Sequence, residues 1–180
     1  MNLLQIFIIA LGLSADAFAI SISCGLSAKR ITIRFIITTG LYFGISQGLM
    51  PVAGFFLASF FTEALSGIGN WITIIVFILL GTKTLIEALK NESENINISI
   101  KTMLALAFAT SIDAFAVGVS FAFTQVNLLL AVIIIASTTF ILCCIGTKIG
   151  SIFGAKFKSK AGIFGGLLLI GMGVFLLIMS

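Results

Sequence analysis

The sequence predicts an all-α, polytopic membrane protein with six transmembrane helices arranged as two inverted-topology repeats of three helices. Of its 180 residues, 60% are hydrophobic and 9% are charged, whereas a water-soluble domain is about one quarter charged. A transmembrane helix needs about 20 predominantly apolar residues, and the weakly charged stretches of this chain come in units of that length. An internal repeat, described below, predicts the inverted arrangement.

Each expected helix corresponds to one stretch with few charges. The first repeat, residues 1–90, is predicted to contain helices at about 3–25, 36–60 and 70–89, and residues 91–101 form a cytoplasmic linker. The second repeat, residues 102–180, is predicted to contain helices at about 103–123, 128–154 and 161–179. Polar residues at 124–127 indicate the turn that divides the long apolar stretch of the second repeat.

The basic residues of the connections predict the orientation of the chain, because short cytoplasmic loops carry an excess of Lys and Arg. The first, third and fifth connections hold Lys29, Arg30, Arg34, Lys90, Lys101, Lys156, Lys158 and Lys160. We therefore expect these connections in the cytoplasm and both termini outside it. The net charge of +4 is then an orientation signal, and no nucleic-acid binding is expected, since that requires basic residues on one folded surface.

The internal repeat pairs the segment LSADAFAISIS at 13–23 with TSIDAFAVGVS at 110–120, and six of the eleven positions are identical. Each half contributes three helices, so the second half must enter the membrane from the opposite side. Inverted repeats of this kind are typical of secondary transporters, whose binding sites lie near the bilayer midplane. A duplicated helical scaffold without transport is the alternative.

Asp16 and Asp113 occupy equivalent positions in the repeat, each near the middle of a predicted span. A carboxylate at the bilayer centre costs about 2.5 to 3.5 kcal/mol on insertion scales, and intramembrane acidic residues usually mark ion pathways. A protonated aspartate bonded to a neighbouring hydroxyl or backbone group is the structural alternative. We favour a cation site, because two carboxylates neutralise one divalent cation.

Further oxygen donors are expected near the two carboxylates. Helical spacing places Ser23 on the face of Asp16, and Thr110 and Ser120 on the face of Asp113. Gln47, near the middle of the second helix, is either a third oxygen ligand or an amide that bonds helix to helix. The chain has no His and its three Cys do not form a zinc motif, so the donor set favours Mg²⁺, Ca²⁺ or Mn²⁺ over Cu⁺ or Zn²⁺.

Two glycine ladders run along the second and fifth predicted helices, at Gly40, Gly44, Gly48 and at Gly146, Gly150, Gly154. Small residues at four-residue spacing allow helices to approach closely in a membrane. We expect both ladders to be helix-packing surfaces.

Several segments resemble the MntP-type manganese efflux pumps of bacteria: LSADAFAIS, TSIDAFAVG, GISQGLMPVAGFF, the NWI before the third helix, and GGLLLIGMGV near the end. The resemblance covers essentially the whole chain. It implies an exporter of Mn²⁺ in the bacterial plasma membrane, and it implies that Asp16 and Asp113 are needed for transport. This sequence has Gln47 where the family usually has a glutamate, so the expected site carries one negative charge fewer.

Export of a divalent cation against an inside-negative potential requires about 4.6 kcal/mol per 100 mV, from about 2.3 for each charge. The sequence has no GxxxxGK[ST] phosphate loop, so we expect proton antiport rather than ATP hydrolysis. No enzymatic activity and no cofactor are expected. The expected partners are the lipid bilayer and the cation, and the sequence is compatible with a homo-oligomer.

Three other functions are compatible with the same residues. Two carboxylates in a cavity lined by small side chains could pair with a small organic amine or with another divalent metal. A membrane scaffold without transport would need neither aspartate. Two aspartates that share a proton could also act as an intramembrane protease, although the inverted repeat favours transport.

Overall fold

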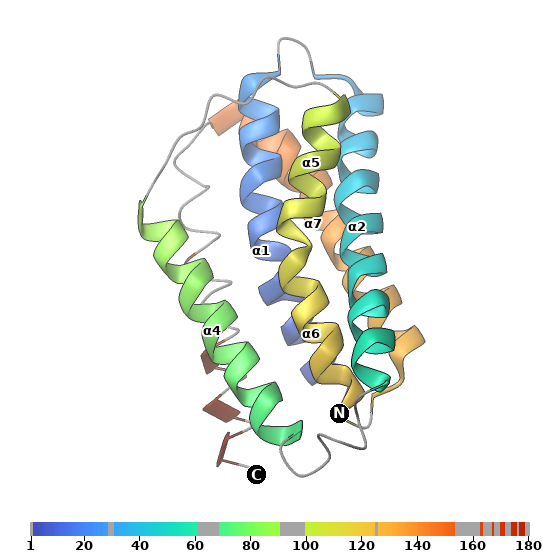
Figure 1. Cartoon of the computed structure of the whole chain (residues 1–180). Helices are drawn as coiled ribbons and strands as arrows, with labels where there is room; N and C mark the ends of the chain where they lie inside the picture. The colour runs from blue at the N-terminus through green and yellow to red at the C-terminus, as the bar shows by residue number, and fades with distance from the viewer. Residues whose placement is uncertain are drawn as a thin grey trace.

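A computed structural model of the chain describes residues 2–28, 31–60, 69–90, 100–124 and 126–153, together with eight positions between 163 and 178. All regular structure in the described residues is helical (Figure 1). The helices are α1 (Leu3–Ser27), α2 (Ile33–Ser59), α4 (Gly69–Lys90), α5 (Ile100–Thr110), α6 (Ile112–Ala122) and α7 (Leu128–Phe153).

Within the part of the chain that the structure describes, four spans are long and apolar enough to cross a membrane: Leu3–Leu26, Ile33–Ser59, Lys101–Ala122 and Leu128–Ile152. Their outward side chains are large and apolar, as lipid-facing residues should be. On α2, for example, Leu41, Ile45 and Leu49 are all exposed. The chain is therefore a multi-pass membrane protein. The predicted third helix coincides with α4, which is not among the four spans, and the predicted helix at 161–179 lies largely outside the described residues.

The fourth predicted span contains an interruption that was not predicted. Its two halves, α5 and α6, are separated at Ser111. The Thr110 hydroxyl donates to the Leu106 carbonyl at 3.0 Å, and the Ser111 hydroxyl donates to the Phe108 carbonyl at 2.9 Å. The helical backbone bonds of Ser111 are still present, since its N–H donates to the Ala107 carbonyl at 3.2 Å and its carbonyl accepts from the Phe115 N–H at 3.1 Å. The interruption is therefore confined to one residue.

The start of α2 also differs from the predicted boundary at residue 36. Thr32 caps the helix, because its hydroxyl oxygen accepts a hydrogen bond from the Phe35 backbone N–H at 3.2 Å. Such a bond satisfies one of the free N–H groups at a helix start. Arg34 consequently lies in the first turn of α2 rather than in the connection.

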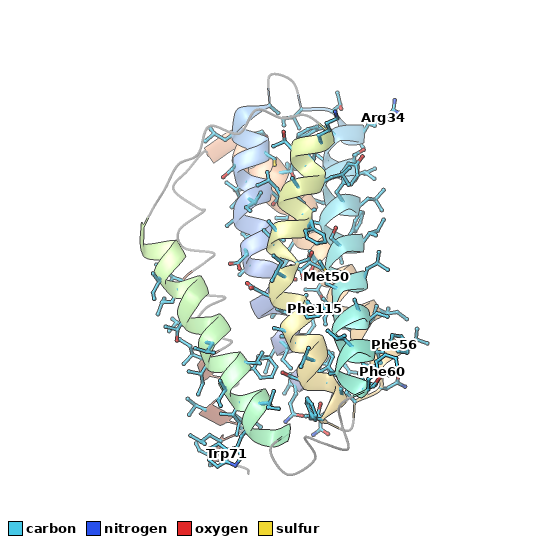
Figure 2. All side chains as sticks on the ribbon, viewed as in Figure 1. Arg34, Met50, Phe56, Phe60, Trp71 and Phe115 are labelled. Carbon is cyan, nitrogen blue, oxygen red and sulfur yellow. The ribbon has the colours of Figure 1, made fainter. Side chains whose placement is uncertain are left out.

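The ends of the helices separate charged from aromatic residues. The end of α1, the start of α2, the start of α5 and the end of α7 lie at the upper end of the bundle in Figure 1, and α4 runs in the same upward direction but ends lower. Arg34 is at this end in Figure 2, and Lys90 and Lys101 are at the corresponding ends of α4 and α5. Phe60 and Trp71, both exposed, lie at the opposite end, where aromatic side chains typically meet a membrane interface.

The helices pack in two corresponding pairs. α1 packs mainly on α7, α2 packs mainly on α6 and α7, and α1 and α2 have little contact with each other. In each pair a glycine allows the backbones to meet. Gly150 of α7 lies against the backbone of Ile22 in α1, and Gly54 of α2 lies against the backbone of Phe115 in α6.

Both glycine ladders are packing surfaces wherever they are described. Gly40, Gly44 and Gly48 of α2 each lie against Phe140 or Ala136 of α7. Gly146 and Gly150 of α7 instead face α1, so the two ladders do not pack on each other. Gly154 lies outside the described residues.

Candidate cation site

A buried glutamine connects the two repeat motifs at the level where all four described spans have their midpoints. Gln47 of α2 is fully buried. Its Nε2 donates to the Leu13 carbonyl oxygen of α1 at 3.3 Å and to the Thr110 carbonyl oxygen at 3.4 Å. Both contacts are longer than the usual 2.7 to 3.2 Å. Because one nitrogen atom reaches both oxygens, the two motifs lie side by side.

The two carbonyl groups are equivalent in the repeat. Leu13 and Thr110 are the first residues of the aligned segments, and each stands three residues before an aspartate. Thr110 is also the last residue of α5, and carbonyl groups at a helix C-terminus begin to lack intrahelical donors. Gln47 therefore joins the two aspartate-bearing segments at matching positions.

The side-chain oxygen of Gln47 has no hydrogen-bond donor in the described part of the chain, although it is buried. A flipped amide, with the positions of Nε2 and Oε1 exchanged, is excluded because it would place Oε1 against two carbonyl oxygens. A buried acceptor without a partner costs about 1–3 kcal/mol. The main-chain oxygen of Gln47 has no helical donor four residues later either, since Pro51 carries no N–H group. Gln47 thus offers oxygen atoms that a cation can use.

The two aspartates have different local surroundings. Asp113 is buried and lies in the first turn of α6, directly after the interruption at Ser111. Asp16 is half-buried and lies in the uninterrupted helix α1. The two equivalent aspartates therefore differ in burial and in the helix around them.

The predicted hydroxyl donors lie at three different levels, because α1 and α6 run in opposite directions (Figure 1). Thr110 is at the level of Gln47, whereas Ser23 and Ser120 are each seven residues after an aspartate, about 10 Å further along the helix. Ser23 and Ser120 are buried and donate to the carbonyls of Ala19 and Ala116 at 3.3 and 3.2 Å. A hydroxyl that donates its proton keeps its oxygen lone pairs, so all three can still act as acceptors or ligands.

A hydroxyl pair that joins α1 to α7 lies at the level of Gln47 and was not predicted. Ser14 Oγ and Thr139 Oγ1 are 2.7 Å apart, and both side chains are fully buried. Ser14 also donates to the Ala10 carbonyl at 2.6 Å. The sequence signal was available, because Ser14 belongs to the repeated motif and Thr139 belongs to the hydroxyl-bearing run 137–139 in the middle of a mainly apolar helix. α7 therefore also contributes a polar side chain at the level of Gln47.

Cys143 is fully buried and packs with Ala17, Phe43 and Ala107, as expected for a small buried hydrophobic residue. No group of three or more His, Cys, Asp or Glu that could hold a metal occurs among the described residues. The donors gathered here are carboxylate, amide, hydroxyl and carbonyl oxygens.

Comparison with known proteins gives consistent results. The family model described as "Putative manganese efflux pump" matches residues 30–177. Proteins named "Putative manganese efflux pump MntP" are similar to the chain over most of its length. The one from Acetivibrio thermocellus is 46% identical and covers 96% of this chain and 89% of its own length. The one from Desulfitobacterium hafniense is 43% identical, covering 99% and 95%, and the one from Mannheimia succiniciproducens is 42% identical, covering 97% and 95%. No solved structure matches the chain.

Proposed function

The chain belongs to the MntP family of manganese efflux pumps, and we propose that it exports Mn²⁺ from the cytoplasm through a midplane site built on Asp16 and Asp113. The family consists of membrane transporters rather than enzymes, so Mn²⁺ is the transported substrate and not a cofactor. The contact of Gln47 with both repeat motifs is the observation that carries the two-aspartate proposal, because it brings the segments before Asp16 and Asp113 together.

In this proposal one Mn²⁺ binds between the two carboxylates, whose charges it neutralises. Gln47 Oε1 and the Thr110 hydroxyl complete the nearby oxygen donors, which suit a hard divalent cation. Ser23 and Ser120, two helical turns away, serve as oxygen donors along the path of the ion rather than in the same coordination shell. The hydroxyls and the amide are neutral, so the loaded site carries no net charge.

We further propose that the chain has six transmembrane helices in two inverted repeats, residues 1–90 and 102–180, joined by the linker 91–101. The packing supports this: the first and fifth spans pair in the same way as the second and fourth, and each pair has a glycine at a backbone contact. Gln47, bonded to equivalent carbonyls of the two repeats, stands close to the axis that would relate them. α4 and the helix expected at 161–179 are the third members of the two repeats.

The proposed orientation gives a testable prediction. With Lys and Arg at one end of the bundle, we expect that end in the cytoplasm and both termini outside. A single cysteine added at either terminus, in a variant that lacks the native cysteines, should react with a membrane-impermeant maleimide in intact cells. A cysteine added in the linker 91–101 is the matched control and should react only after lysis. The opposite pattern would reverse the orientation.

The proposed energy source is proton antiport through the two aspartates. At least two protons must enter for each Mn²⁺ that leaves if no net charge is to move against the potential. In inside-out vesicles, Mn²⁺ uptake should follow an imposed pH gradient and should stop when nigericin removes it at zero membrane potential. Uptake that continues unchanged without the pH gradient would exclude proton antiport, while uptake lost in Asp16→Asn under the same conditions would still support the site.

A further inference from the structure

The two hydrogen bonds that Gln47 Nε2 donates also connect helices of the two repeats. They join α1 to the α5–α6 junction, two segments that otherwise have few contacts with each other. α2 supplies the connection, and it packs closely on α6 and α7. Gln47 is therefore a side chain from a third helix that contacts both aspartate-bearing segments.

We propose that Gln47 is a positioning residue. Its amide nitrogen holds Leu13 and Thr110 together and so sets the separation of the Asp16 and Asp113 segments, and it does so without any change in its own protonation. This inference rests on the proposed two-aspartate site. The nitrogen of an amide carries two hydrogens, one for each carbonyl, and it carries them at every physiological pH. Its oxygen, held on the other side of the amide, stays available to the cation.

A carboxyl group at this position would behave differently. A protonated carboxyl has one hydrogen to donate, and an ionised carboxylate has none. A carboxylate would also face two carbonyl oxygens at the distance where Nε2 now stands. The substitution Gln47→Glu should therefore add a pH dependence to the separation of the two segments, beyond any that Asp16 and Asp113 produce in the unaltered protein. Gln47→Leu should remove the connection at every pH.

The separation can be measured directly by pulsed electron paramagnetic resonance. Spin labels at Leu26→Cys of α1 and Leu104→Cys of α5 would report it, since both positions are exposed. The native Cys24, Cys143 and Cys144 are replaced by alanine in this background. Gln5→Leu serves as the matched control, because the Gln5 side chain accepts a hydrogen bond from the Asn2 backbone N–H at the exposed start of α1, far along the helix from Leu13.

We expect the parent protein and Gln5→Leu to give the same narrow distance distribution at each pH, and any pH dependence that Asp16 and Asp113 produce is common to both and serves as the reference. Gln47→Leu should broaden the distribution at all pH values. Gln47→Glu should match the parent at low pH and broaden reversibly as the pH rises, and the return on acidification excludes misfolding as the cause. Distributions for Gln47→Leu and Gln47→Glu that equal the parent's at every pH would overturn the proposal.

Transport provides a second readout. The maximal rate of Mn²⁺ export should fall about tenfold or more in Gln47→Leu, the loss expected when buried carbonyl partners are left unmet. In Gln47→Glu at high pH, the added negative charge should lower KM for Mn²⁺ while the maximal rate falls. If the parent protein moves no Mn²⁺ but the distances change as expected, the positioning role stands and the proposed function fails.

Discussion

Asp16→Asn and Asp113→Asn should each reduce Mn²⁺ export by about 100-fold or more. Removing one member of a buried charge cluster typically costs about 3–5 kcal/mol, and here the remaining carboxylate could not neutralise the ion. The double variant should add little to either single loss, because residues that act as a unit are not additive. Export is measured as the initial rate of Mn²⁺ uptake into inside-out vesicles at matched protein abundance.

Glu63→Gln is the matched control for this experiment, since the sequence places Glu63 in a connection outside the predicted helices. It should leave the export rate close to that of the parent protein. Partial losses for Asp16→Asn and Asp113→Asn that simply multiply in the double variant would indicate two independent sites instead of one.

Gly118→Ala should strongly reduce the stability of the folded protein. A methyl group at Gly118 would overlap the main-chain atoms of Pro51 in α2, and backbone cannot move aside as a flexible side chain can. Overpacking of this kind typically costs about 1–3 kcal/mol. The melting temperature of the protein in detergent should fall clearly. It is measured by size-exclusion chromatography of samples that have been heated. Gly54→Ala should behave alike, because its methyl group would meet the backbone of Phe115.

Gly171→Ala is the control for the glycine variants. No atom of the described chain lies within 4 Å of the position that its methyl group would take, and alanine is the better helix former by about 0.5–1 kcal/mol. Its melting temperature should equal or slightly exceed that of the parent. A Gly118→Ala protein as stable as Gly171→Ala would show that α2 and α6 do not pack as closely as described.

Helix positions could be predicted from the sequence because they depend on the length of apolar stretches. The predicted spans at 3–25 and 128–154 lie within a few residues of α1 and α7. The choice of packing partners could not be predicted, since both glycine ladders have the same four-residue spacing. One ladder packs on α7 and the other on α1, and the difference depends on neighbours far away in the sequence.

The contacts of the candidate site could not be predicted from the sequence. The sequence left Gln47 either as an oxygen ligand or as an amide that bonds helix to helix. In the structure its nitrogen joins helices, as the second interpretation predicts, and its oxygen has no hydrogen-bond donor among the described residues. The oxygen-ligand interpretation stays a prediction.

The break at Ser111 shows a similar limit. Ser14 and Ser111 occupy the same place in the repeat, but Ser14 is held by Thr139 of α7 and its helix continues. A partner on a distant helix, which the repeat itself cannot reveal, distinguishes the two positions.

The central claim is that Asp16 and Asp113 hold one Mn²⁺ between them. Titration of the purified protein with Mn²⁺, followed by the loss of the electron paramagnetic resonance signal of the free ion, tests this claim most directly. The proposed site predicts one tightly bound Mn²⁺ per chain, and none at the same concentrations in either Asp16→Asn or Asp113→Asn. Two bound ions per chain, with one retained in each single variant, would contradict it.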